Sequence, residues 1–244
     1  MKSFPLLLHV PHASIQIPAE YKNDFSADLS KELHCMTDWY TDELFDLPAS
    51  KLVFPVSRLV CDVERFRDDS AEEMSHRGMG ACYTHGHDGT IIRELSEWKR
   101  EHILRQLYDP HHARLTNITA EMLRRHGSCL IIDCHSFSKI ALPYEPDQSR
   151  ARPDICIGTD PFHTTGKIVE VLTKAFSQRG YSVFVNKPYA GTIVPMKYFH
   201  TKENVHSVMI EINRGLYLDG SCRKLPSFYQ VKRDISLAIE KLIY

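Results

Sequence analysis

The sequence lacks the features that mark several large classes of protein. Its 244 residues contain no repeat or low-complexity tract, and 11 glycines and 13 prolines are ordinary usage, which excludes a collagen-like chain. Lys and Arg total 30 against 31 Asp and Glu, so the net charge of -1 gives no overall attraction to nucleic acid or to an anionic membrane. A chain of this length, 43% hydrophobic, buries enough core to fold without disulfides.

Signals for export or membrane insertion are also missing. The only apolar run near the start is short and is interrupted by Pro5, His9 and Pro11, so it predicts neither a signal peptide nor a membrane span. The seven cysteines form no Cys-x-x-Cys pair and mostly lie in apolar segments, which indicates reduced thiols. The basic clusters at 99–102 and 124–125 lack interleaved aromatic residues. We therefore expect a cytoplasmic protein with neither a membrane nor a nucleic acid as partner.

What the chain does have is an alternation of short apolar segments and helical patterns. The apolar segments, bounded by turn residues as buried strands are, lie at 5–10, 52–63, 129–135, 154–159, 181–186 and 207–213. Helix-like spacing covers 28–46, 92–126, 161–179 and 227–243. This alternation predicts a single α/β domain over residues 1–244, with a mixed or largely parallel sheet. The polar, irregular stretch at 67–90 is a candidate active-site loop.

Two histidines follow predicted strands at the point where each strand ends. His12 comes after the first strand and His135 after the segment LIIDC. Ligands bind at the carboxyl ends of strands in such sheets, and two imidazoles there can share one Zn²⁺. Asp133 is placed to orient a ring from behind. The alternative is that each histidine only hydrogen-bonds within its own loop.

A third zinc ligand is expected to be a carboxylate from the segment TDWYTDEL. Asp38 and Asp42 are four residues apart, so on a helix they share one face. The alternative for both is an ordinary solvated helical face.

Glu211 is an acidic residue within the apolar strand pattern VMIEINR. A buried carboxylate is costly unless it is paired, so it is rarely placed there without a role. Beside water activated by zinc, it can accept a proton and pass it to the leaving nitrogen of an amide. The alternative is an ion pair with Arg214 or Arg58.

Eight segments, in order over residues 4 to about 220, resemble the N-formylglutamate amidohydrolase (N-formylglutamate deformylase) family. They are PHAS at 11–14, TDWYTDEL at 37–44, SRLVCDVER at 57–65, YDPHHARL at 108–115, DCHS at 133–136, PDICIGT at 153–159, NKPYAGT at 186–192 and IEINRGLYLD at 210–219. The resemblance implies a hydrolase fold like that of zinc carboxypeptidases, with helices on both faces of a mixed sheet. It also implies zinc held by His12, Asp38 and His135, with Glu211 as the base.

The implied activity is hydrolysis of an N-acyl amino acid such as N-formyl-L-glutamate, a reaction that some members of the family perform in histidine degradation. Family members usually have PHSG where this chain has PHAS, and Asn where it has Glu64. These departures leave the metal chemistry intact and bear on the choice of substrate.

A substrate with two carboxylates needs cationic partners. Arg58, Arg65 and Arg214 lie in the motif segments at predicted strand ends, and guanidinium groups bind carboxylates through two hydrogen bonds. Asn186 in the NKPYAG turn is a further candidate for substrate binding, although a purely turn-forming role is equally open.

Three other functions remain open from the sequence. A zinc peptidase or an amidase of different specificity would use the same residues, and a non-catalytic binding protein could keep the fold. A thiol hydrolase using Cys134 and His135 is disfavoured, because neighbouring residues on a strand point to opposite faces.

Overall fold

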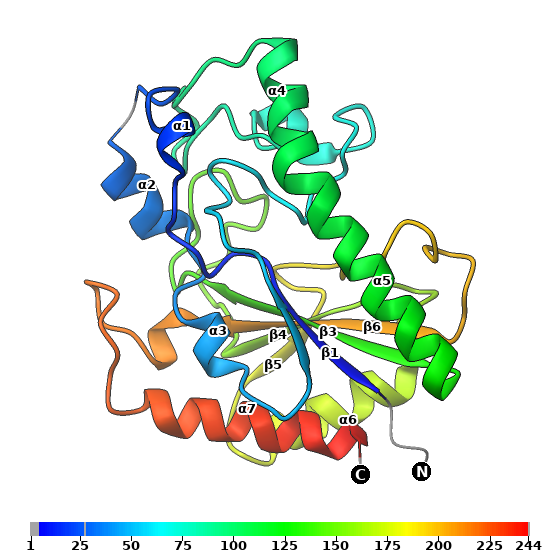
Figure 1. Cartoon of the computed structure of the whole chain (residues 1–244). Coiled ribbons are helices and arrows are strands. Elements are labelled where there is room, and N and C mark those ends of the chain that lie inside the picture. Colours follow the sequence, from blue (N-terminus) through cyan, green and yellow to red (C-terminus); the bar gives the residue numbers. More distant parts are fainter. Residues whose placement is uncertain (1–4, 27, 244) are drawn as a thin grey trace.

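A mixed β-sheet forms the centre of the computed structural model, which describes residues 5–26 and 28–243 (Figure 1). In these residues six strands lie in the order β2-β1-β3-β6-β4-β5. Their bounds are Leu6–Val10 (β1), Ser50–Val53 (β2), Cys129–Phe137 (β3), Ile155–Gly158 (β4), Val183–Val185 (β5) and Val205–Asn213 (β6). Strands β2, β1, β3 and β6 are parallel, β4 is antiparallel to β6, and β5 is parallel to β4. The prediction of a mixed, mostly parallel sheet is therefore confirmed.

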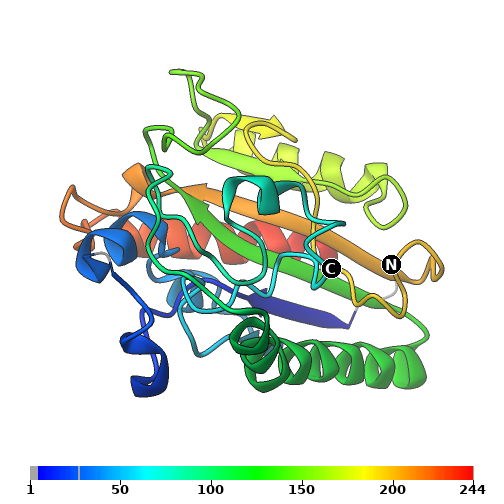
Figure 2. The ribbon, with the colours of Figure 1, turned by 90° about the horizontal axis from the view of Figure 1, so that it is seen from above.

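Helices cover both faces of this sheet (Figure 1). The described helices are α1 (Ala19–Lys22), α2 (Leu29–Met36), α3 (Thr41–Leu44), α4 (Glu97–Ile103), α5 (Asp109–His126), α6 (Gly166–Ser177) and α7 (Phe228–Ile243). In Figure 1, α5 lies on one side of the strands and α6 and α7 lie on the other, and in Figure 2, seen from above, α7 lies behind the strands. Short 3₁₀ turns occupy Glu73–Arg77 and Arg214–Leu216. A π-helical turn, Leu104–Tyr108, joins α4 to α5 just before Pro110, which has no N–H to donate.

The two faces of the sheet are built from alternate residues of the same strands. On one face, Ile132 of β3 and Ile210 of β6 are fully buried in a large apolar cluster with α3, α6 and α7. On the other face, Ile131 packs with residues of α5 near the amino ends of the strands. Towards the carboxyl ends this second face becomes polar, and it is covered by loops instead of helices.

The chain leaves the sheet earlier than the apolar run at 52–63 predicted. Strand β2 ends at Val53, and residues after Pro55 form turns, with Ser57 N–H donating to Gln16 O. Pro55 has no N–H to donate to a neighbouring strand, so the strand does not continue past it. The apolar residues that follow are buried in a separate apolar cluster with α4 and neighbouring loops. The prediction of a strand over 52–63 was wrong beyond Val53, and the turn it missed carries site residues.

The helix predicted over 28–46 is interrupted. The backbone is extended at Thr37, after α2, and Tyr40 adopts a left-handed conformation (φ 63°) before α3 begins. Asp38 therefore lies between two helices and not on a helical face. In the described part of the chain, no helix combines the length and the apolar character needed to cross a membrane.

Candidate functional site

Three predicted metal ligands converge above the carboxyl ends of β1 and β3. His135 lies near the end of β3, His12 follows β1 by two residues, and Asp38 sits in the interruption between α2 and α3. All three side chains are buried. Elements that are distant in sequence thus bring two imidazoles and one carboxylate to one place.

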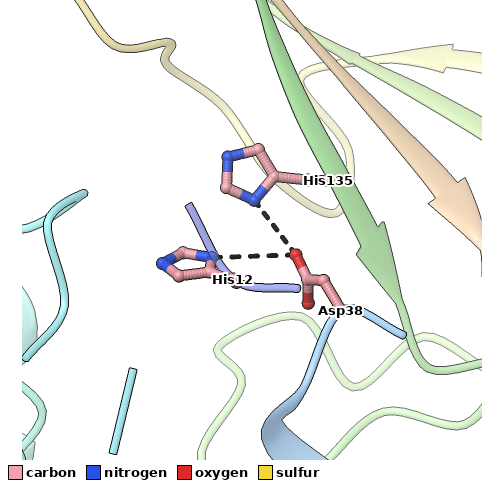
Figure 3. Close-up of side chains that lie close together, drawn as sticks. All are labelled: His12, Asp38 and His135. Atoms are coloured by element: carbon pink, nitrogen blue, oxygen red, sulfur yellow. Dashed lines mark hydrogen bonds and ion pairs between the residues drawn. The ribbon is translucent and has the colours of Figure 1, made fainter. Parts of the chain in front are cut away.

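Both imidazoles present Nδ1 to the same carboxylate oxygen (Figure 3). Asp38 Oδ2 lies 3.2 Å from His135 Nδ1 and 3.7 Å from His12 Nδ1. The ring centroids of the two histidines are 5.0 Å apart. Within this group, one potential ligand atom from each residue lies within 4.8 Å of the others, which is close enough for all three to share an ion.

A carboxylate holds the opposite nitrogen of each ring. His12 Nε2 lies 2.8 Å from Asp62 Oδ1, and His135 Nε2 lies 3.0 Å from Asp133 Oδ1. Asp62 is held in turn by Arg58 Nη2 at 2.8 Å and by the Tyr83 hydroxyl at 2.6 Å. Such carboxylate–histidine pairs fix the orientation of metal-binding imidazoles and increase their basicity.

The buried carboxylates of the cluster stabilise positive charge beside them, as the pKa values of Asp38 and His135 indicate. Burial alone would raise the pKa of Asp38, but the nearby imidazoles of His12 and His135 outweigh it and hold this pKa well below its usual range. Burial alone would lower the pKa of His135, but the charge of Asp133 and the hydrogen bonds to Asp133 and Asp38 raise it well above the usual value. Without a metal, a proton on His135 supplies this positive charge.

The donor set fits a metal ion such as Zn²⁺. Two histidine nitrogens and one carboxylate are a common protein ligand set for zinc that leaves a position for water or substrate. His12 Nδ1 is buried and has no hydrogen-bond partner among the described residues, as a nitrogen reserved for an ion would be. The buried carboxylates around the two rings can balance the charge of a divalent cation, in the same way as they balance the charge of a protonated imidazole.

Glu211 lies beside this cluster on the next strand. Its backbone position is directly opposite His135 in the β3–β6 register, and neighbouring strands are about 4.8 Å apart. The side chain is buried, and Oε2 has no hydrogen-bond partner among the described residues. Burial raises the pKa of Glu211 to about 8, although the charge of His135 opposes the rise. No ion pair joins Glu211 to Arg58 or Arg214 in the described structure, so nothing supports that alternative.

A cavity of about 660 Å³ opens over these residues. His12, Asp38, His135 and Glu211 line it, and so do all three predicted arginines, Arg58, Arg65 and Arg214. Arg214 Nη1 donates to the carbonyls of Cys35 and Thr37, at 3.1 and 2.8 Å, while its Nε is buried without a partner among the described residues. Arg65 Nε is likewise buried without a hydrogen bond, 3.7 Å from Asp62 Oδ2.

Other candidate residues lie elsewhere. Asn186 does not line the cavity. Its side-chain amide is hydrogen-bonded to Thr159: Oδ1 accepts from the Thr159 N–H and Nδ2 donates to the Thr159 hydroxyl, each at 2.8 Å. Asp42 is exposed on α3, away from the histidines. Cys134 points into the apolar cluster on the far face of the sheet, which separates it from the cavity.

Three residues that support the site, Asp62, His9 and His111, have no role in the prediction made from the sequence. Asp62 lies in the segment predicted to be a strand. His9 Nδ1 lies 3.1 Å from both Asp133 Oδ1 and Glu64 Oε1, and its Nε2 lies 2.9 Å from His111 Nε2. A histidine inside the apolar run LLLHV was the one available signal, because a buried imidazole needs partners.

Comparisons with solved structures agree with this architecture. A crystal structure of N-formylglutamate amidohydrolase from Ralstonia eutropha JMP134 is similar with a TM-score of 0.87 and 23% identity, covering 100% of this chain and 95% of that one. The gene product Atu2144 from Agrobacterium tumefaciens is similar with a TM-score of 0.71 and 20% identity, covering 99% and 95%. At these identities the likeness shows the fold. No curated protein sequence gives a match.

Family membership follows from the sequence itself. The model of the N-formylglutamate amidohydrolase family matches residues 4–218, which include every segment on which the resemblance was based except the last residue of the final one. The match also spans the cluster, Glu211 and all three arginines of the cavity. This chain therefore belongs to the N-formylglutamate amidohydrolase family, a family of hydrolases.

Proposed function

We propose that this chain is a zinc-dependent amidohydrolase that cleaves an N-acyl amino acid such as N-formyl-L-glutamate into formate and the amino acid. The observation that carries the proposal is the buried group of His12, Asp38 and His135 beside Glu211, in one cavity of a chain of this family. A cytoplasmic location is part of the proposal, and the seven free cysteines support it because thiols persist in a reducing compartment.

His12 and His135 would hold the metal through Nδ1, and Asp38 through a carboxylate oxygen. When bound there, zinc supplies a positive charge that polarises the amide carbonyl and acidifies water. Asp62 and Asp133 keep both rings oriented by holding each Nε2.

Glu211 is the residue that moves the proton. Its buried side chain faces the cavity without a competing hydrogen bond on Oε2, so it can accept a proton from the attacking water. The raised pKa keeps that proton on the carboxyl long enough to be delivered to the departing amine nitrogen. Water thus adds across the amide: the carbonyl carbon gains the hydroxyl, and the nitrogen leaves with the proton.

Arginines of the cavity bind the carboxylates of the substrate. Arg214 is the best candidate, since two backbone carbonyls fix its Nη1 while its Nε is left without a partner among the described residues. Arg65 offers a second Nε without a hydrogen bond, although Asp62 lies 3.7 Å from it, and Arg58 adds charge although Asp62 and Tyr83 already engage it. Asn186 would reach substrate only by leaving its bonds to Thr159.

The test is metal analysis combined with hydrolysis assays. Purified protein should contain about one zinc per chain and should release formate from N-formyl-L-glutamate faster than from its neutral amide, N-formyl-L-glutamine. His12→Ala should lose both metal and activity, whereas His163→Ala, which removes a buried histidine outside the cavity, should keep both. Metal binding without hydrolysis of any formyl amino acid, acetyl amino acid or dipeptide would leave only a binding protein with this fold. Cleavage of dipeptides alone would indicate a zinc peptidase.

A further inference from the structure

The cavity extends well beyond the metal cluster. Its volume of about 660 Å³ falls within the 300–1,000 Å³ typical of pockets that hold drug-sized ligands. A formyl group contributes a single carbon to a substrate. Space therefore remains on at least one side of the reacting amide.

Part of the lining of that space is apolar. We call it the apolar wall, and it consists of the cavity-lining residues Phe66, Ile193, Val194, Met196, Phe199 and Met209. Met209 precedes Glu211 by two residues on β6, so it lies on the same face of the sheet and about 7 Å from it along the strand. The wall thus begins within a few bond lengths of the proposed general base.

Backbone contacts fix the wall against the sheet. Gly158 lies opposite Met209 in the β4–β6 register, and a Cβ there would meet the Met209 methyl and come within 2.5 Å of Gly191 O. The absence of this Cβ lets the segment that follows Gly191 approach the sheet. Ile193 N–H then donates to Asp133 Oδ2 at 2.9 Å, which ties the wall to the residue that orients His135.

The outer part of the wall leaves apolar surface open. Met196 is 58% exposed and Phe66 is 39% exposed, and Phe66 meets Phe199 edge-on at 6.5 Å between ring centroids. Burying such surface under a ligand is favourable, at about 25 cal/mol per Å² in area terms. These exposed side chains line the cavity and are therefore available to a bound molecule.

The wall and two of the arginines are connected to different nitrogens of the His135 ring. Asp38, next to its Nδ1, is 4.0 Å from Arg58 Nη1, and Arg214 binds the adjacent carbonyl of Thr37. Asp133, next to its Nε2, carries the bond from Ile193. A substrate whose carboxylate meets Arg214 or Arg58 can therefore lie with its acyl group on the wall. Glu64 lines the cavity near His135 Nε2, at 3.9 Å, and disfavours an anionic acyl group.

We propose that this cavity takes N-acyl amino acids whose acyl group is neutral, apolar and larger than formyl, with the acyl chain lying on the apolar wall. This proposal rests on the proposed function and specifies its substrate class. The reaction is the same hydrolysis: water adds across the amide, the acyl carbon leaves as a carboxylic acid, and the nitrogen takes the proton. The amino acid product is unchanged.

The test is a series of N-acyl-L-glutamates, from formyl through acetyl and butanoyl to hexanoyl, assayed with the zinc-loaded protein. Each methylene that is buried should raise kcat/KM about three- to fourfold, so hexanoyl should exceed formyl at least tenfold. Met196→Glu should reduce this ratio about tenfold or more. Ile91→Glu is the matched control, because Ile91 is 59% exposed but does not line the cavity, and it should leave the ratio unchanged.

Two outcomes separate this proposal from the proposed function. If formylglutamate is hydrolysed but kcat/KM stays flat or falls with chain length, the apolar subsite is refuted and the amidohydrolase survives. If no member is hydrolysed, the proposed function fails, and binding decides the subsite: hexanesulfonyl-L-glutamate should bind at least tenfold more tightly than methanesulfonyl-L-glutamate by calorimetry. Equal affinities would overturn the proposal.

Discussion

The two faces of the sheet use the same strands for opposite purposes. Ile210 and Cys134 point to the face covered by α6 and α7, where they lie in the large apolar cluster. Their neighbours Glu211 and His135 point to the other face and line the cavity. Because side chains alternate along a strand, a single sequence step changes the environment from core to site. One face supplies the rigidity on which the geometry of the other depends.

The two faces also differ in what they contribute to the stability of the folded chain. The apolar face gains from burial, whereas the polar face encloses several carboxylates and imidazoles that are costly to bury unless each has a partner. Asp62 and Asp133 are fully buried, and each is satisfied by side chains of the site together with one backbone N–H. A fold under selection for stability alone would have no reason to hold them there.

The largest effect is expected at Glu211 on the polar face. Glu211→Gln keeps the shape but cannot accept a proton, so kcat/KM should fall by about 10²–10⁴-fold. Bound zinc, measured by elemental analysis, should stay at the wild-type level because Glu211 is not among the proposed ligands. Near-normal turnover would assign the proton transfer to another residue.

The adjacent residue tests the apolar face. Ile210→Ala removes a fully buried side chain, so the free energy of unfolding should fall by about 2–5 kcal/mol in a denaturant titration. Folded protein should still bind zinc, and its kcat/KM should change far less than in Glu211→Gln. If Ile210→Ala lost metal as readily as a ligand variant, the two faces would not be separable.

Sequence patterns predicted the frame of the molecule well, since five of the six apolar runs coincide with most of a strand. The apolar run at 52–63 was wrongly predicted to be one strand, because the residues after Pro55 form a turn that is buried by packing and not by strand pairing. For the same reason the sequence did not indicate that Asp62 belongs to the site. His12, His135 and Glu211 could be singled out because strand ends meet at one edge. The choice between Asp38 and Asp42 could not be made from spacing, because it depends on the interruption at Tyr40.

A smaller effect is expected from the carboxylate behind His135. Asp133→Asn keeps an acceptor for Ile193 N–H but loses the charge that orients the ring, so zinc affinity should weaken about 10–100-fold. Asp234→Asn is the matched control, because Asp234 is a buried carboxylate of α7, held by Tyr181 and Gln230 outside the cavity. Competition with a chelator measures both variants. Equal weakening in the two would mean that the loss reflects general destabilisation.

The smallest expected effect concerns the stability of the metal-free protein at different pH. Burial raises the pKa of Glu211 from 4.5 to about 8, so folding favours its neutral form. Burial alone would lower the pKa of His9, but hydrogen bonds with Asp133 and Glu64 raise it from 6.5 to about 9, so folding favours its charged form. Both groups bind protons more tightly when the chain is folded. The contribution of Glu211 is therefore fully present below pH 4.5 and is lost as the pH rises through 8, and that of His9 is present below 6.5 and is lost through 9.

The melting temperature of the metal-free protein should accordingly fall between pH 6.5 and 9. For one group that titrates only in the unfolded chain, a change of one pH unit should shift the melting temperature by at most about 3–5 °C in a chain of this size. Glu211→Gln removes one of these titrations and leaves those of His9 and His135, so its melting temperature should decline less steeply up to pH 8, and calorimetry of both proteins measures the difference. An identical slope in the two would mean that Glu211 is ionised in the folded protein before zinc binds. The polar face would then carry one more negative charge in the metal-free protein, and a bound cation would stabilise that face more strongly than it would with Glu211 neutral.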